Sequence, residues 1–215
     1  MNSLEARKLL AAQPGLGAGN FLIHAYSSAQ YPEKPILFSD KPVLVGKGRV
    51  YDKFSLSDLL YFTRSLASWY LRQGVKAQQL IAIYMDNDLN IFLHFMAITS
   101  IGAIAVLVNG KMKVEVASDY LRRIKIKGLI CGEAQFSTLS QKREELEEID
   151  FFKSYTDISW DKDAVLPQNY PYQHQPNDIV MICHSSGTTG SPKPVTLLHE
   201  AYFYGIKYYL CNPPD

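Results

Sequence analysis

The chain has 215 residues, of which 47% are hydrophobic and 20% are charged, the composition of a folded globular protein rather than a disordered or fibrous one. Its 22 basic and 21 acidic residues give a formal net charge of +1, so it lacks the basic surplus with which proteins bind nucleic acids. The three cysteines are far apart and form no CxxC pair, which argues against a disulfide framework or a zinc site and favours a cytoplasmic protein.

The N-terminal region is loosely patterned. Charged residues between positions 5 and 8 interrupt its first apolar stretch, so no signal peptide is expected. Prolines recur through this region, and short strands are expected around residues 35–39 and 42–46. The stronger local signals begin only after it.

The first such signal is a helix that begins at Ser55 and stops at Gly74. Ser55 and Asp58 have the spacing of a capping box, in which each side chain satisfies a free backbone N–H at the start of a helix. Glycine commonly ends helices because it adopts the left-handed conformation without strain. A short apolar strand is expected to follow at residues 80–84. Apolar residues recur at helical spacing within the helix: Leu56, Leu59, Leu60, Ala67, Tyr70 and Leu71.

Residues 91–108 form an uncharged stretch of 18 residues, at the lower limit of what a membrane crossing requires. The stretch contains polar residues and changes character at Gly102, with a helix-like pattern before it and a strand-like pattern after it. A fully buried strand is also a continuous apolar run. We therefore expect a buried helix followed by a buried strand, and no membrane span.

The second half continues the alternation of helices and strands. An amphipathic helix is expected over 114–125, with Arg122, Arg123 and Lys125 on its solvent side. Buried strands are expected at 128–132 and 178–184. The charged run 141–150 is interpreted as a solvated helix face, residues 166–177 as a loop, and 199–210 as a helix whose aromatic residues need a partner. Together these elements predict a layered α/β fold with a largely parallel sheet.

The segment that carries chemistry is HSSGTTGSPKPV, at residues 184–195. All residues from Ser185 to Ser191 are Ser, Thr or Gly, so backbone N–H groups and hydroxyls can approach a ligand closely, and Lys193 adds a mobile positive charge. Such a set of short donors suits the oxygens of an oligophosphate. The Walker pattern does not fit, because Pro192 stands where its second glycine is required, and a dinucleotide GxGxxG is also absent.

This string resembles the phosphate-binding signature of the adenylate-forming superfamily, which contains acyl-CoA synthetases, luciferases, adenylation domains of nonribosomal peptide synthetases and carboxylic acid reductases. Residues 54–75 are similar to the family's Thr-Tyr-x-Glu-Leu helix, and 80–109 to its next strand, helix and strand. The resemblance covers about residues 45–200. It implies the N-terminal portion of the family's large domain, with 1–45 as an N-terminal segment of the same domain and 46–215 as a partial AMP-binding domain.

The resemblance implies a reaction in two steps. A carboxylic acid attacks the α-phosphorus of ATP in the presence of Mg²⁺ and forms an acyl-adenylate and pyrophosphate. The acyl group then passes to the thiol of coenzyme A or of a carrier protein's phosphopantetheine. Lys193 would neutralise charge on the departing pyrophosphate. The residues implied to hold the β- and γ-phosphates are Ser185, Ser186, Gly187, Thr188, Thr189 and Gly190.

Two residues depart from the family pattern. Pro194 replaces a glycine, which removes a backbone N–H and predicts a stiffer exit from the loop. His184 replaces an aromatic residue, and its simplest role is that of a strand-end histidine satisfied by the backbone. Cys183 is expected to be a buried small apolar residue.

The other histidines show no metal-binding spacing, so no protein-held metal is expected. His24 and His174 lie in loop-like segments, His94 in an apolar helix, and His199 at the start of the last helix. Any magnesium would therefore enter with ATP.

The family's later elements, which bind adenine and ribose and carry a catalytic lysine, have no counterpart in these 215 residues. We therefore expect the N-terminal fragment of a larger adenylating ligase, inactive by itself, whose partners are a carboxylic acid and the remainder of the enzyme or a carrier protein. The alternative is a truncated, inactive relative that acts as a binding module through the aromatic helix at 199–210.

Overall fold

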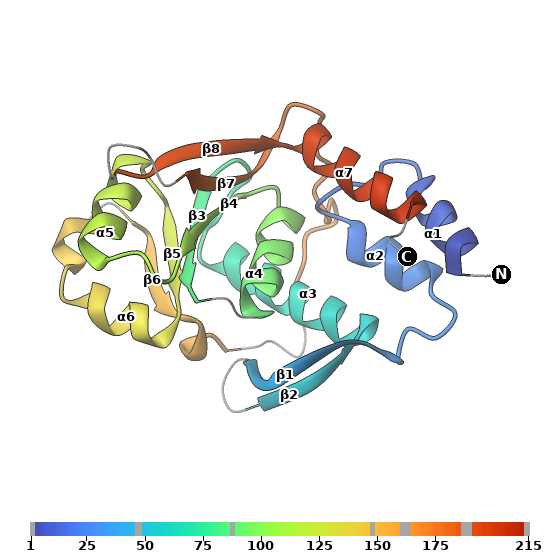
Figure 1. Ribbon diagram of the computed structural model, residues 1–215, viewed down its shortest axis with the longest axis horizontal. Helices are drawn as coiled ribbons and strands as arrows, with labels where there is room; N and C mark the ends of the chain where they lie inside the picture. The colour runs from blue at the N-terminus through green and yellow to red at the C-terminus, as the bar shows by residue number, and fades with distance from the viewer. Residues whose placement is uncertain are drawn as a thin grey trace.

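The computed structural model describes residues 3–45, 49–86, 89–146, 149–159, 164–185 and 191–212. Its main sheet has six strands in the order β6-β5-β3-β4-β7-β8 (Figure 1). All neighbouring strands in it are parallel except β7 and β8, which confirms the predicted largely parallel α/β fold. The strands are β3 (Leu80–Met85), β4 (Ile104–Asn109), β5 (Gly128–Cys131), β6 (Phe151–Ser154), β7 (Ile179–Ser185) and β8 (Lys193–Leu198).

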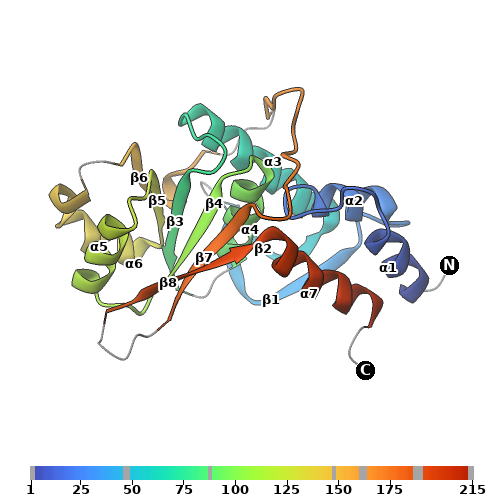
Figure 2. The same cartoon turned by 90° about the horizontal axis from the view of Figure 1, so that it is seen from above.

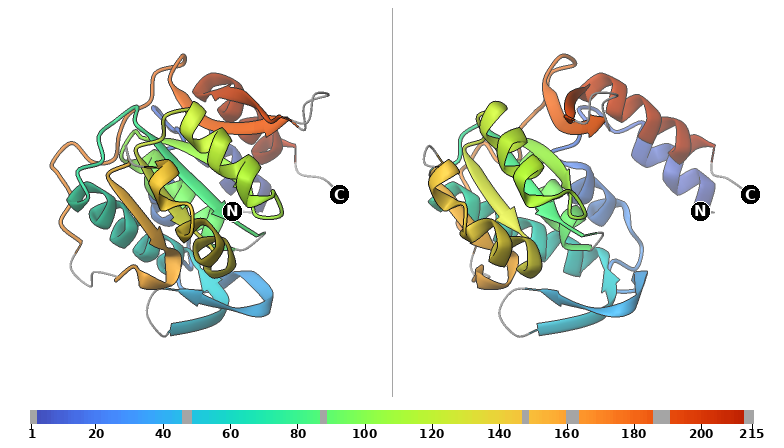
Figure 3. Two further views of the ribbon diagram at one scale, coloured as in Figure 1. Left: turned by 90° about the vertical axis from the view of Figure 1, so that its left-hand side faces the viewer. Right: turned by 60° about the vertical axis from the view of Figure 1, so that its left-hand side comes forward.

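Helices cover both faces of the sheet. One face carries α3 (Leu56–Arg72) and α4 (Leu89–Ser100), and the other carries α5 (Val114–Arg123) and α6 (Glu133–Ser140) (Figure 3). Side chains alternate along a strand, so Ile81 and Ile83 of β3 belong to the core beneath α3 and α4. Ala82 and Tyr84 belong to the core beneath α5 and α6. The central strand is thus buried on both sides, as its continuous apolar sequence predicts.

The capping box of α3 is confirmed. The Ser55 hydroxyl accepts a hydrogen bond from the Asp58 N–H at 3.1 Å, and the Asp58 carboxylate accepts one from the Ser55 N–H at 2.9 Å. The helix ends at Arg72, and Gly74 follows with φ of 80°. These contacts satisfy backbone groups that a helix start otherwise leaves free.

The uncharged stretch 91–108 folds as predicted, with α4 joined to β4 through a turn at Gly102. Gly102 has φ of 78°, and a Cβ on it would lie 2.5 Å from the ring of Tyr172, which packs over the end of α4. Tyr172 also donates its backbone N–H to the Ser100 carbonyl at 2.9 Å. No helix among the described residues is long and apolar enough to cross a membrane.

The expected helix at 141–150 is wrong. The helix in this region is α6, which ends at Ser140, and within its described residues, 141–146 and 149–150, the charged run forms a short 3-10 helix, η1 (Arg143–Leu146). Leu146 and Ile149 are buried in the core beneath α5 and α6, so the run is not simply a solvated face. A second 3-10 helix, η2 (Tyr155–Asp157), follows β6.

The N-terminal region is more ordered than its pattern predicts. It contains α1 (Ser3–Ala11), α2 (Phe21–Ser28) and the antiparallel hairpin of β1 (Pro35–Val45) and β2 (Arg49–Ser55). The two short strands expected around 35–46 are therefore one strand, β1, with an irregular register between Phe38 and Val43.

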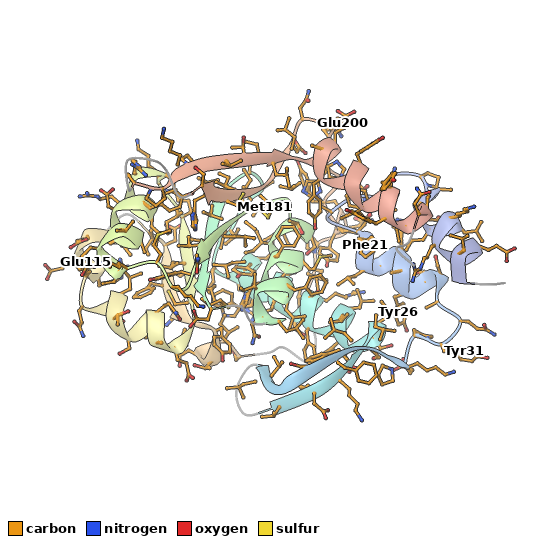
Figure 4. The ribbon with its side chains drawn as sticks, in the orientation of Figure 1. Phe21, Tyr26, Tyr31, Glu115, Met181 and Glu200 are labelled. Atoms are coloured by element: carbon orange, nitrogen blue, oxygen red, sulfur yellow. The ribbon has the colours of Figure 1, made fainter. Side chains whose placement is uncertain are left out.

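The last helix, α7 (His199–Cys211), lies beside α1 although the two come from opposite ends of the chain (Figure 2). Phe203 is buried there in a small core with Leu10, Leu16, Ala18 and Val180. Phe21 and Met181 pack against both this small core and the core beneath α3 and α4 (Figure 4). The aromatic helix α7 thus buries part of its apolar surface against other elements of the same chain.

The Gly102 turn generates a stability prediction. Gly102→Ala should lower the free energy of unfolding by about 2–5 kcal/mol, because the new methyl group is strained at positive φ and meets the Tyr172 ring. The measurement is chemical denaturation of the variant and the unmodified protein.

Gly74→Ala is the matched control. Gly74 has φ of 80°, but a Cβ added to it would meet no atom within 4 Å, so only the backbone strain of about 1–2 kcal/mol should appear. Equal losses for the two variants would show that the Tyr172 contact does not constrain the turn.

Candidate functional site

The candidate site lies at the edge of the sheet where the parallel strands end. The chain runs from β3 to β4 on one side of β3 and then to β5 on its other side, so the order of strands reverses there. Open α/β sheets bind ligands outside the carboxyl ends of their strands near such a reversal. The neighbouring strand β7 ends at this edge, and its last residue, Ser185, is paired with Lys193 at the start of β8.

Of the predicted site residues, the structure therefore brings Ser185 and Lys193 together as partners in one antiparallel pair. The Lys193 side chain is exposed. The remaining predicted residues lie outside the described part of the chain: Ser186, Gly187, Thr188, Thr189 and Gly190.

His184 joins the end of β7 to β4. Its Nε2 accepts a hydrogen bond from the Asn109 N–H at 3.2 Å, and its ring packs edge-on against Tyr120. Burial lowers the pKa of His184, and a ring nitrogen that accepts a hydrogen bond must be unprotonated. This agrees with the predicted backbone-satisfied histidine, and His184 contributes no positive charge in this state.

Arg123, the last residue of α5, contacts the residues directly before β8. Its guanidinium donates from one terminal nitrogen to the Ser191 hydroxyl at 2.9 Å and from the other to the Pro192 carbonyl at 2.5 Å. The sequence correctly places Arg123 on the exposed side of its helix, but nothing in its local pattern indicates a contact with residues 68 and 69 positions away.

Pro194 lies in β8 opposite His184, on the outermost strand of the sheet. Proline lacks a backbone N–H and is confined in sheets to edge strands, strand starts and bulges. The departure from the family's glycine therefore falls at a position where the sheet tolerates it.

A pocket of about 290 Å³ opens beside His184 at the same edge. Its remaining polar lining comes from Asn109 and Cys183, and Cys183 is half-buried rather than fully buried as expected. Such a surface can accept a small apolar group next to the segment between β7 and β8. The apolar lining residues are Ile83, Met85, Ile91, Leu107 and Val108.

Gln135 joins the carboxyl ends of β3 and β4. Its side-chain amide donates to the Asp86 carboxylate at 3.1 Å and to the Gly110 carbonyl at 3.0 Å. Gly110 itself passes so close to Met85 and Asp86 that a Cβ would lie 2.3 Å from the Asp86 nitrogen. The carboxyl ends of β3 and β4 are thus held together by contacts that the sequence pattern does not reveal.

The histidines elsewhere are structural. His94 is buried in α4, where its Nδ1 lies 2.7 Å from the Tyr70 hydroxyl, and burial lowers its pKa to about 3. His174 stacks on His199, and burial lowers the pKa of His174 to about 4. His199 accepts a hydrogen bond from the Ala18 N–H at 3.2 Å.

His24 lies in α2 and not in a loop as expected. In the part of the chain that the structure describes, no group of three or more His, Cys, Asp or Glu side chains is placed to hold a metal ion.

The sequence matches the family of AMP-binding enzymes over residues 26–213, and the chain belongs to this family. It is 31% identical over 202 residues to 3-aminoavenalumate diazotase of Streptomyces sp., covering 94% of this chain and 35% of that protein. It is 27% identical to 4-chlorobenzoate–CoA ligase of Arthrobacter sp., covering 69% of this chain and 28% of the ligase.

The fold is that of the N-terminal domain of adenylate-forming enzymes. It superposes on the crystal structure of a long-chain-fatty-acid–CoA ligase from Archaeoglobus fulgidus with a TM-score of 0.69 and 17% sequence identity, covering 91% of this chain and 38% of that one. The chain thus spans 35%, 28% and 38% of the length of these three proteins.

The buried histidines generate a prediction on pH. The pKa of His94 is lowered on folding, so the unfolded chain binds more protons below about pH 6.5, and the free energy of unfolding falls as the pH is lowered toward 3. Each such histidine contributes a slope of about 1.4 kcal/mol per pH unit between its two pKa values.

His94→Gln should remove one such contribution. The free energy of unfolding measured between pH 6 and 4.5 should therefore depend less steeply on pH in the variant, by about 1.4 kcal/mol per pH unit, whatever its stability at pH 7. Parallel pH dependence in the variant and the unmodified protein would show that His94 is not kept neutral by the fold.

Proposed function

We propose that this chain supplies the phosphate-binding part of an enzyme that uses ATP to activate a carboxylic acid as an acyl-adenylate. The observation that carries the proposal is the position of the Ser/Thr/Gly string. It connects β7 to β8, whose paired residues Ser185 and Lys193 lie at the edge of the sheet where the parallel strands end, and Lys193 follows it after Pro192. Membership of the AMP-binding enzyme family supports the same reaction class.

In the proposed reaction, a carboxylate oxygen of the acid attacks the α-phosphorus of ATP. The bond from that phosphorus to the bridging oxygen breaks, and pyrophosphate leaves with both electrons of the bond. A thiolate of coenzyme A or of a carrier protein's phosphopantetheine then attacks the acyl carbon and releases AMP. The native protein would act in the cytoplasm, with residues 1–45 and 46–215 as parts of one AMP-binding domain.

The residues fit this chemistry by type. Transfer of a nucleotidyl group depends on positioning and on stabilising negative charge that develops on the leaving phosphate. The Lys193 ammonium would neutralise the departing pyrophosphate, and Mg²⁺ would enter bound to ATP. The hydroxyls and backbone N–H groups of Ser185, Ser186, Gly187, Thr188, Thr189 and Gly190 would hold the β- and γ-phosphates.

A second candidate function rests on α7. Tyr204, Tyr208 and Tyr209 expose 75%, 55% and 65% of their surface, more than aromatic side chains usually leave to water. A catalytically inactive relative could use this face to bind a partner. This candidate predicts that the native protein has no adenylating activity.

Acid-dependent exchange of pyrophosphate into ATP by the native protein tests the proposal. The acids should include benzoates, fatty acids and amino acids, because the family's chemistry leaves the acid open. Lys193→Ala should reduce kcat/KM for MgATP at least about tenfold, since a charged hydrogen bond is worth about 1.5–3 kcal/mol.

Lys127→Ala is the matched control. Lys127 is also exposed but lies directly before β5, at the amino end of the parallel strands, so its loss should leave exchange unchanged. Absence of exchange and of MgATP binding in the native protein would reject the proposed function and favour the binding module. Equal losses in the two variants would reject the role of Lys193.

A further inference from the structure

Arg123 ties α5 to Ser191, the last residue of the Ser/Thr/Gly string, and to Pro192, which follows it. We propose that Arg123 is a positioning residue that fixes the exit of this string and so holds Lys193 in place for the phosphates of ATP. The proposal rests on the proposed function for the nature of the ligand. The tie itself, the pair of hydrogen bonds from Arg123 to Ser191 and Pro192, is present in the chain without ligand.

The geometry is that of a two-point hold. Two terminal nitrogens of one guanidinium donate to two successive residues, to the hydroxyl of Ser191 and to the carbonyl of Pro192. The planar fork of arginine is suited to such paired acceptors, whereas a lysine ammonium acts as a point charge. Arg123 is supported from its own helix, because its guanidinium lies 5.9 Å from the Tyr120 ring centre.

The held residues lead directly into Lys193. Pro192 is buried, and its carbonyl belongs to the peptide unit that contributes the Lys193 N–H. Lys193 then pairs with Ser185 across the start of β8. Fixing the Pro192 carbonyl therefore fixes the direction in which the chain enters β8, and with it the position of the Lys193 backbone.

A separate contact holds the chain at the start of the string. The residue before Ser185 is His184, whose ring accepts the Asn109 N–H of β4. The string therefore leaves β7 from a point fixed by β4 and enters β8 at a point fixed by α5. Residues ordered before binding reduce the conformational entropy that a ligand would otherwise have to remove.

The neighbouring Arg122 shows that the contact is specific to one arginine. Arg122 has the same charge, is 64% exposed, and pairs along its own helix, with Asp119 at 3.0 Å. An exposed pair of this kind contributes little to stability. Arg122→Ala therefore removes the same net charge as Arg123→Ala without removing the tie.

The test compares Arg123→Ala, Arg123→Lys and Arg122→Ala in the native protein. Without nucleotide, amide hydrogen exchange in the peptide containing Ser191 and Lys193 should be about tenfold faster in Arg123→Ala and unchanged in Arg122→Ala. In pyrophosphate exchange, the KM for MgATP should rise about tenfold in Arg123→Ala while kcat and the KM for the acid change far less. Arg123→Lys should be intermediate.

Ser191→Ala completes the design, because it removes one of the two acceptors. Its effect should be smaller than that of Arg123→Ala, and the double variant should be no worse than Arg123→Ala alone. Melting temperatures of all variants identify any that fail to fold, and Arg123→Lys retains the charge if Arg123→Ala does not fold.

The outcomes separate this proposal from the proposed function. Unchanged amide exchange in Arg123→Ala overturns the tie, and a similar rise in KM for Arg122→Ala overturns it in favour of a net-charge effect. Faster exchange with an unchanged KM for MgATP overturns the positioning role. If the unmodified protein neither binds MgATP nor exchanges pyrophosphate, the proposed function fails, and with it the role toward ATP, while amide exchange still decides the tie.

Discussion

The parallel pairing of β3 with β4 on one side and β5 on the other is the constraint on which the rest of the structure depends. Both faces of β3 are buried, Ile81 and Ile83 in one core and Ala82 and Tyr84 in the other. Helices must therefore cover both faces, and each strand in the parallel set must run in the same direction. The carboxyl ends of these strands then meet at one edge, which gives the candidate site its place before any residue of the site is considered.

The sequence predicts the elements whose signals are local. The capping box at Ser55, the glycine turns at Gly74 and Gly102, and the apolar runs of β3, β4, β5 and β7 are each specified by neighbouring residues. The missed elements depend on tertiary contacts. The four-residue β6 is a strand because it pairs with β5, and the charged run at 141–150 buries Leu146 and Ile149 against the core instead of forming a solvated helix face. The pairing of β6 with β5 is not encoded in a local period of the sequence.

The same division runs through the candidate site. The Ser/Thr/Gly string and Lys193 form a continuous motif, so they are recognisable from the sequence. Asn109, Gln135 and Arg123 act through contacts with residues distant in the chain, and their own surroundings carry no corresponding pattern. A residue type with many uses, such as arginine at the end of a helix, becomes informative only when its acceptors are known.

The positive charge at the candidate site depends on which of its basic side chains are protonated. His184 accepts a hydrogen bond from a backbone N–H, so protonating it would oppose both this contact and its burial. Lys193 and Arg123 both bring positive charge beside the ends of the string. Arg123 directs its donors to a hydroxyl and a carbonyl, which satisfies acceptors of the chain itself, whereas the Lys193 side chain is exposed. Arg123 thus satisfies acceptors of the chain itself, while the exposed Lys193 side chain remains accessible to an anion, as the proposed phosphate-binding role requires.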